Sequence, residues 1–175
     1  MRIACVLDNG FEDAEFQDPY KAFGDAGHQV MVIGLEAGRD LKGKRAQVTV
    51  RSDEGIADVR AEEFDALFIP GGYSPDHLRA DPRMVEFARQ FAAASRPILA
   101  ICHGPQLLLS ARTVEGRQMT AWKTIQEDLK LGGARVVDKE VVVDGNLVTS
   151  RQPSDIPAFV RESLAVLERV PATTR

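Results

Sequence analysis

The sequence has few cysteines and no long hydrophobic run. Only Cys5 and Cys102 occur among its 175 residues, so disulfide bonds do not hold this fold together. The apolar run at residues 3–7 is too short for a signal-peptide core or a membrane span. Since no such segment directs the chain out of the cytosol, where free thiols stay reduced, we expect a cytoplasmic protein that contacts no membrane.

A strong charge of either sign is also missing. The formal net charge is −4 and the isoelectric point is about 5.4, without a cluster of Lys and Arg. This argues against a nucleic-acid partner, because such partners are bound by neutralising their phosphates. No spacing of Cys and His is typical of a metal site, so none is expected.

The length and composition fit one globular domain. A chain of 175 residues can bury a sizeable core, and 44% hydrophobic with 27% charged residues is ordinary for such a domain. No repeat, low-complexity segment or Pro-, Gly- or Ser-rich linker divides the chain. We predict a single domain over residues 1–175.

Short apolar runs alternate with helical patterns. Strands are predicted at 3–7, 30–34, 48–50, 66–69 and 98–101, and a hairpin over 141–149 is indicated by its Asp-Gly turn. Helices are predicted within 13–26, from 81 onward, at 106–112, at 124–131 and near the C-terminus. The first helix has two possible starts, since Asp18-Pro19 also fits a cap followed by proline. The alternation predicts an α/β fold, a three-layer α/β/α sandwich with a mostly parallel sheet.

Sites in such sheets form at the carboxyl ends of the strands. Cys102 ends one buried strand and is followed almost directly by a helix. This arrangement places a residue on an exposed, strained turn, beside the positive end of the helix dipole. Cysteines in such places reach pKa values of roughly 3.5–7.5, so we expect a reactive thiolate on a nucleophile elbow. Cys5 lies in mid-strand and is expected in the core.

Three further groups could assist this cysteine. His103 is a candidate base, but neighbouring side chains on a turn usually diverge, so its role stays open. Its backbone N–H, together with those of Gly71 and Gly72, could bind an oxyanion. An ordinary tight turn explains the glycine pair equally well.

Acidic residues crowd the loop after the first strand: Glu12, Asp13, Glu15 and Asp18. The helix dipole alone favours carboxylates there. Alternatively, one carboxyl points at Cys102, where repulsion between thiolate and carboxylate would make one of the two hold a proton and donate it to the other. His28 and His77 are expected at the surface, and Trp122 in the core or at a partner contact.

Four motifs together resemble those of the ThiJ/PfpI superfamily. Residues 100–105 (Ala-Ile-Cys-His-Gly-Pro) resemble its nucleophile elbow, 9–15 its acidic first loop, 69–72 its oxyanion loop, and 141–151 its late hairpin. The resemblance runs from residue 1 to about 167. It is closest to the branch of PfpI-like intracellular proteases and general stress proteins.

The resemblance implies a flavodoxin-like sandwich with Cys102 as nucleophile and Glu15 as its carboxyl partner. Glu12 is expected to help bind the substrate. In the protease-like branch a further acid, usually Glu, reaches the histidine from a neighbouring subunit; the matching residue is Asp76, one methylene shorter. The resemblance also implies a homo-oligomer, a dimer or larger. An amidotransferase is excluded, because no histidine follows His103.

Three functions remain open. The first is a stress enzyme that acts through the Cys102 thiolate on reactive aldehydes, such as methylglyoxal or glycated adducts, without metal or organic cofactor. The second is a peptidase for small peptides, with His103 as base and Asp76 supplied across a subunit contact. The third is a non-enzymatic redox sensor or holdase-type stress protein whose thiol is oxidised to sulfinate.

Overall fold

A computed structural model describes residues 1–170; residues 171–175 of the predicted domain lie outside the described part. A central sheet of seven strands has the order β10-β11-β7-β6-β1-β2-β5. Its strands are β1 (Arg2–Val6), β2 (Gln29–Gly34), β5 (Glu54–Gly55), β6 (Ala66–Ile69), β7 (Ile98–Ile101), β10 (Val141–Asp144) and β11 (Leu147–Ser150). All neighbours pair in parallel except β10 and β11, which form the predicted antiparallel hairpin.

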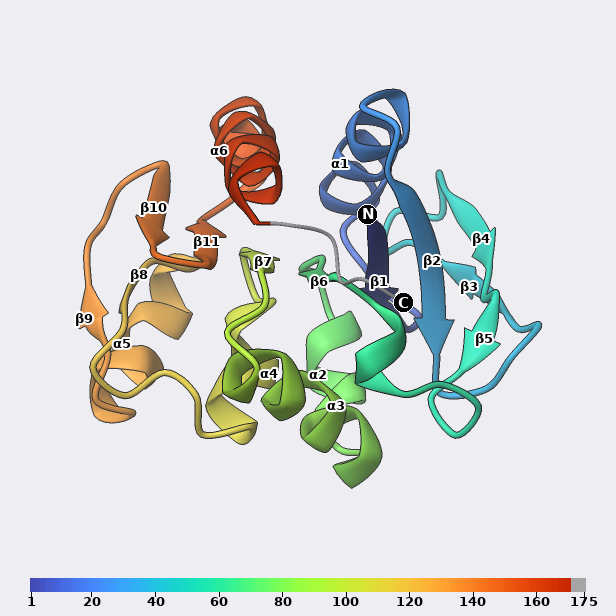
Figure 1. Cartoon of the computed structure of the whole chain (residues 1–175), viewed down its shortest axis with the longest axis horizontal. Coiled ribbons are helices and arrows are strands. Elements are labelled where there is room, and N and C mark those ends of the chain that lie inside the picture. The colour runs from blue at the N-terminus through green and yellow to red at the C-terminus, as the bar shows by residue number, and fades with distance from the viewer. Residues whose placement is uncertain (171–175) are drawn as a thin grey trace.

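Helices cover both faces of this sheet (Figure 1). One face carries α1 (Asp13–Asp25) and α6 (Ile156–Arg169), and the other carries α2 (Ser74–Leu78), α3 (Pro82–Ala93) and α4 (Pro105–Ser110). Helix α5 (Lys123–Leu131) lies beyond the β10 end of the sheet in the same view. The predicted three-layer sandwich with a mostly parallel sheet is confirmed.

Smaller elements fill the connections. Strands β3 (Asp40–Lys42) and β4 (Thr49–Arg51) form an antiparallel pair, and β8 (Gln118–Met119) pairs in parallel with β9 (Arg135–Val136). Short 3-10 helices span Ala61–Glu63 and Pro153–Asp155. Of these elements the sequence pattern indicated only the strand near residue 49, because runs of two or three residues show no measurable periodicity.

The first helix begins at the earlier of its two possible starts. Glu12 has extended backbone angles and the helix starts at Asp13, which leaves Pro19 inside it. A proline there removes one helical hydrogen bond, and a helix normally loses about 3 kcal/mol by it. The acidic first turn is thus part of the helix, and this position decides where Glu15 points.

The core has two halves, one on each face of the sheet. Along β1, Ala4 and Val6 face the α3 side, whereas Ile3 and Cys5 face α1 and α6. This alternation is what a strand covered on both faces requires. Cys5 is fully buried, as predicted for a core residue.

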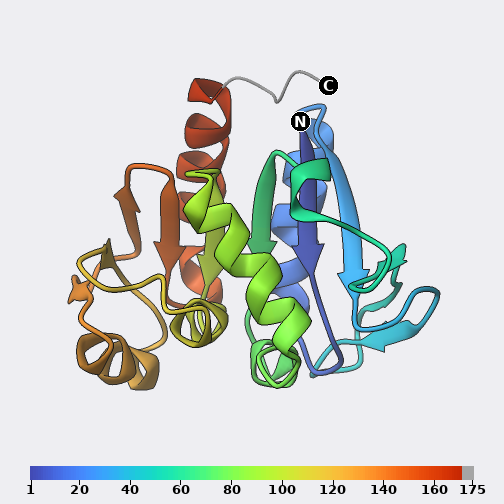
Figure 2. The same cartoon turned by 60° about the horizontal axis from the view of Figure 1, so that its bottom comes forward.

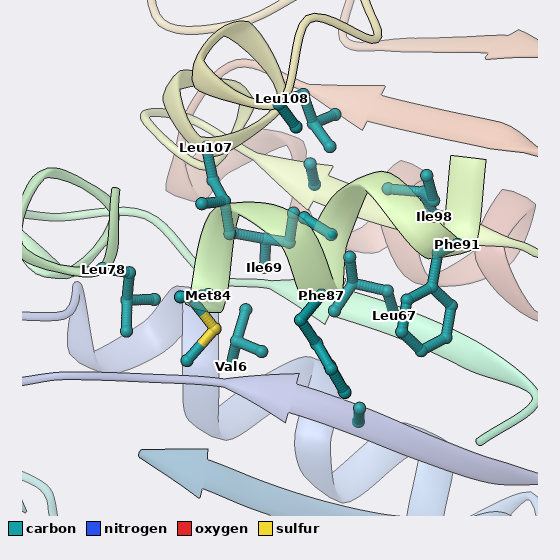
Figure 3. Close-up of a cluster of buried hydrophobic side chains, with 14 of the residues drawn as sticks. Val6, Leu67, Ile69, Leu78, Met84, Phe87, Phe91, Ile98, Leu107 and Leu108 are labelled. Atoms are coloured by element: carbon teal, nitrogen blue, oxygen red, sulfur yellow. The ribbon is translucent and has the colours of Figure 1, made fainter. Parts of the chain in front are cut away.

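Helix α3 contributes the apolar face predicted from its spacing. Asp81 caps it by accepting a hydrogen bond from the Arg83 N–H at 2.9 Å. Figure 3 shows Met84, Phe87 and Phe91 of this helix packed among side chains of the sheet. The cluster anchors β6 and β7, the two strands whose ends carry the glycine pair and Cys102.

The parallel strands run in one direction, so their carboxyl ends meet at one edge of the sheet (Figure 2). The short helix α2 lies at that edge. None of the helices in residues 1–170 is long and apolar enough to cross a bilayer.

Candidate active site

Cys102 occupies a strained elbow between β7 and α4. Its φ angle is +61°, in the left-handed region that costs an L-residue about 1–2 kcal/mol. The backbone is pinned on both sides: the Cys102 N–H donates to the Ser150 carbonyl at 2.9 Å, and its own carbonyl accepts from the Trp122 N–H at 3.0 Å. These bonds hold the residue in a conformation that it would otherwise leave, as predicted for a nucleophile elbow.

Glu15 points from the first turn of α1 toward this cysteine. Its side chain is completely buried, and neither carboxyl oxygen makes a hydrogen bond of standard geometry. The Cys102 thiol and the Gly71 N–H nevertheless lie near enough to lower its pKa. A buried carboxyl without a full set of hydrogen-bond partners destabilises the folded state, so its position beside the sulfur indicates a functional role.

Gly71 and Gly72 make the close approach of these groups possible. A Cβ atom on Gly71 would lie 2.3 Å from Glu15 Oε2 and 2.7 Å from Cys102 Cβ, so any side chain there would collide with both. Gly72 has a φ angle of +81° and pairs with Phe11 of the first loop in an antiparallel bridge. The glycine pair therefore brings the first loop and the elbow together.

The two titratable groups influence each other strongly. Burial raises the pKa of Glu15 to about 8, and the negative charge of Glu12 adds to this shift, so Glu15 holds a proton at pH 7. Burial and the charge of Glu15 also raise the pKa of the Cys102 thiol, against the N–H groups of His103 and Gly72, which lower it. The prediction of a lowered thiol pKa was wrong, because Cys102 is only 7% exposed and α4 is a short helix with a weak dipole effect.

His103 does not diverge from the sulfur. Its Nδ1 lies 3.3 Å from Cys102 Sγ, close enough for a hydrogen bond to sulfur. Burial and the charge of Lys44 lower the pKa of the imidazole, whereas Asp76 raises it. The ring also stacks on Trp122 with the two centroids 6.3 Å apart. A neutral imidazole next to the thiol is the state these shifts favour.

Asp76 lies on α2 and is exposed. It influences His103 within the same chain through its charge, although no hydrogen bond joins the two residues. The suggested role of this acid across a subunit contact stays a prediction. His77 is exposed, as expected, with Nδ1 3.8 Å from Asp8 Oδ2; His28 is partly buried beside the N-terminus, where its pKa is lowered.

Glu12 is buried in an ion cluster. Its carboxyl oxygens lie 3.2 Å from Lys44 Nζ and 3.4 Å from Arg45 Nε, and its N–H donates to the Gly71 carbonyl at 3.1 Å. A carboxylate cannot donate to an oxyanion, so Glu12 fits an electrostatic role better than an oxyanion-binding one.

Lys44 was missed at the sequence level. It lies in the turn at residues 43–48, between β3, which was not predicted, and β4, which was predicted at 48–50. The only local sign is the run Lys42-Gly43-Lys44-Arg45. Asp13 of α1 holds this turn: its carboxylate accepts the N–H groups of Arg45, Gln47 and Val48 at 2.8–3.0 Å. Although burial opposes it, these bonds lower the pKa of Asp13.

The remaining features are a surface hollow and the side chains that could ligate a metal ion. A surface hollow of about 510 Å³ lies between α3 and residues 56–62, and none of its lining residues belongs to the group around Cys102. In residues 1–170, no set of three or more His, Cys, Asp or Glu side chains could hold a metal ion.

Fold and geometry together define a class: a flavodoxin-like α/β sandwich with a cysteine on an elbow and a buried carboxyl beside it. The chain belongs to the DJ-1/PfpI family, whose pattern it matches over residues 1–166. This membership confirms the resemblance seen in the four sequence motifs.

Relatives cover nearly the whole chain. General stress protein 18 of Bacillus subtilis is 53% identical over 96% of this chain and 98% of that protein. Protein/nucleic acid deglycase 2 of Escherichia coli is 50% identical over 95% and 97%, respectively. In a solved two-domain protein of Anabaena variabilis, with DJ-1/ThiJ/PfpI-like and ferritin-like domains, the matching part is 36% identical with a TM-score of 0.93. It covers 95% of this chain and 48% of that one.

Proposed function

We propose that the protein is a cofactor-independent stress enzyme that converts reactive carbonyl compounds through Cys102. The observation that carries this proposal is the pairing of an elbow cysteine with a buried carboxyl whose pKa is raised to about 8. A group with such a pKa can give and take protons near neutral pH, as the conversion of a dicarbonyl requires. The names of the stress protein and the deglycase among the relatives support the same direction.

The first step adds the thiol to an aldehyde. Glu15 in its ionised form takes the proton of Cys102, and the thiolate sulfur attacks the aldehyde carbon. The carbonyl π electrons move to oxygen, where the N–H groups of Gly72 and His103 can bind the oxyanion. Glu15 returns the proton to this oxygen, which gives a neutral hemithioacetal and an ionised Glu15 again.

The second step moves a hydrogen between neighbouring carbons. For methylglyoxal, Glu15 removes the proton from the former aldehyde carbon to form an enediolate, and it then delivers that proton to the adjacent carbon. The hydroxyl proton on the former aldehyde oxygen passes to the former ketone oxygen, so that a carbonyl group forms on the carbon bound to sulfur. The product is a thioester of lactate. Water cleaves the thioester and releases lactate with the free thiol of Cys102, so methylglyoxal and water together account for all atoms of lactate.

The test is an incubation of the purified protein with methylglyoxal, followed by chiral detection of lactate. We expect turnover by the parent and a loss of at least 100-fold in Cys102→Ser, since a hydroxyl is a far poorer nucleophile here. Turnover by Cys102→Ser at the parent rate would refute the role of the sulfur. Cys5→Ser is the matched control, because that thiol is fully buried within strand β1.

A second candidate function is cleavage of small peptides. The contact of 3.3 Å between His103 Nδ1 and the sulfur favours it, since a neutral imidazole could accept the thiol proton. A fluorogenic peptide assay separates the two functions. Asp76→Ala should lower peptide cleavage, which needs an oriented imidazole, and leave lactate formation within about twofold.

A further inference from the structure

Two cations share one carboxylate at the edge of the site. Lys44 Nζ lies 3.2 Å from one oxygen of Glu12, and Arg45 Nε lies 3.4 Å from the other. Each oxygen already has its cation, so the side chains of Glu12, Lys44 and Arg45 together carry one positive charge in excess. The nearby Asp13 carboxylate is bound to three backbone N–H groups of the turn. Arg45 alone would suffice to neutralise Glu12.

The charge of Lys44 reaches the groups around Cys102. Lys44 acts electrostatically on Glu15 and on His103, the two side chains that flank the sulfur. Its ammonium group also lies 5.5 Å from the ring centroid of Tyr73, the residue after the glycine pair. Tyr73 is 61% exposed, unusual for a large aromatic side chain, so this edge of the site is open to solvent.

Lys44 is held in place and yet accessible. The turn that carries it is fixed by the three N–H groups bound to Asp13, and the Lys44 N–H donates to the Phe11 carbonyl at 2.7 Å. Its side chain is 39% exposed, so the ammonium can still donate to a group arriving from solvent.

Negative charge is supplied by a different element. Asp76 is on α2 and raises the pKa of His103, and Asp8 lies 3.8 Å from His77 of the same helix. A substrate in the site therefore meets a cation carried by the 43–48 turn and an acid carried by α2. Such a polarity orients a molecule with one charged end.

We propose that Lys44 forms an anion-binding subsite beside Cys102, and that this site prefers carbonyl substrates with a carboxylate next to the reacting carbon. Asp13 acts as the positioning residue that holds the turn. The substrate preference rests on the function proposed above, because it needs a carbonyl to react with the sulfur. The subsite itself is independent of that function.

The subsite can be tested with two alkylating reagents that differ mainly in charge. Cys102 is alkylated with iodoacetate or with iodoacetamide at one pH, and both rates are followed by mass spectrometry. Both reagents consume the same thiolate, so the ratio of the two rates cancels the thiolate fraction. Cys5 is fully buried and does not compete.

We expect Lys44→Met to lower the ratio of iodoacetate to iodoacetamide rates about threefold to fivefold, the range typical of a partly exposed charge pair. Lys44→Arg should keep the parent ratio. Lys21→Met is the matched control, since Lys21 is an exposed lysine in mid-helix paired with Asp25. A ratio that Lys44→Met leaves unchanged, or that Lys21→Met lowers as much, would overturn the subsite.

A second measurement addresses the substrate. In glyoxylate a carboxylate group is bonded directly to the aldehyde carbon. In glycolaldehyde an uncharged hydroxymethyl group takes its place. Both should protect Cys102 from iodoacetamide by forming hemithioacetals, and Lys44→Met should weaken protection by glyoxylate alone. Equal weakening for both would refute the preference. If the charge effects hold while methylglyoxal is not turned over, the proposed function fails and the subsite stands. If methylglyoxal is turned over normally but Lys44→Met has no charge effect, the subsite fails and the proposed function stands.

Discussion

Replacing Glu15 with Gln should change the way in which stability depends on pH. The unfolded chain leaves this carboxyl near its ordinary pKa of 4.5, whereas burial raises the folded pKa to about 8. Between these two values the folded state binds more protons than the unfolded state, so stability falls as the pH rises. The loss begins near pH 4.5 and levels off above pH 8.

The expected magnitude follows from the two pKa values. Linkage gives a loss of roughly 2–3 kcal/mol between pH 5 and pH 7, and of about 5 kcal/mol in all once the carboxyl is fully ionised. Glutamine has nearly the same shape and never ionises, so Glu15→Gln should not suffer this loss. The thiol of Cys102 does not confuse the comparison, because its raised pKa keeps it protonated throughout this range.

Urea denaturation of the parent and of Glu15→Gln at pH 5, 6 and 7 measures this difference. We expect the variant to gain roughly 2–3 kcal/mol on the parent from the lowest to the highest pH. All other ionisable groups are common to both proteins, so their contributions cancel in the difference. A difference that stays constant over these three pH values would show that Glu15 titrates normally, and the proton-shuttle argument would lose its basis.

Four further outcomes are expected. If ionised Glu15 is the base, kcat/KM for methylglyoxal should rise about fivefold from pH 7 to pH 8, because the ionised fraction rises from about a tenth to a half; a flat profile would contradict this. Gly71→Ala should abolish alkylation of Cys102 and destabilise the fold by about 2–4 kcal/mol, since its Cβ would lie 2.3 Å from Glu15 Oε2; unfolding and alkylation rates measure both. Asp76→Asn should lower the pKa of His103 further in an NMR titration, because a raising influence is removed. Phe91→Ala should cost about 3–5 kcal/mol in a urea titration, since this ring is fully buried in the core of Figure 3.

The central strands and the elbow were predicted well because they are continuous apolar runs bounded by strong local signals. Residues 66–69 and 98–101 were predicted at their observed bounds, and the hairpin at 141–149 has the expected pairing. Within residues 36–64 only the strand at 48–50 was predicted, because the strands of this segment have two or three residues and depend on contacts such as those of Asp13.

The position of Glu15 and the electrostatics of the site could not be predicted from the local sequence. The resemblance indicated this carboxyl, but the residues alone left four acids equivalent. Which of them faces the sulfur depends on the exact start of α1, a boundary that propensity leaves uncertain by several residues. The pKa of Cys102 was predicted with the wrong sign, because helix dipoles can be read from a sequence whereas burial on every side cannot.

Several destabilising features occur together around Cys102. Cys102 holds a positive φ angle, Glu15 is a buried acid without standard hydrogen bonds, and Gly71 leaves no room for a side chain. Each of these features destabilises the fold or restricts the sequence, and a purely structural sheet edge would need none of them. They become consistent if the thiol and the carboxyl must exchange a proton at short distance in a nearly dry site. The same argument explains why Asp13 binds the N–H groups of the 43–48 turn. Lys44 must be held in a fixed position if its charge is to act on Cys102 and Glu15.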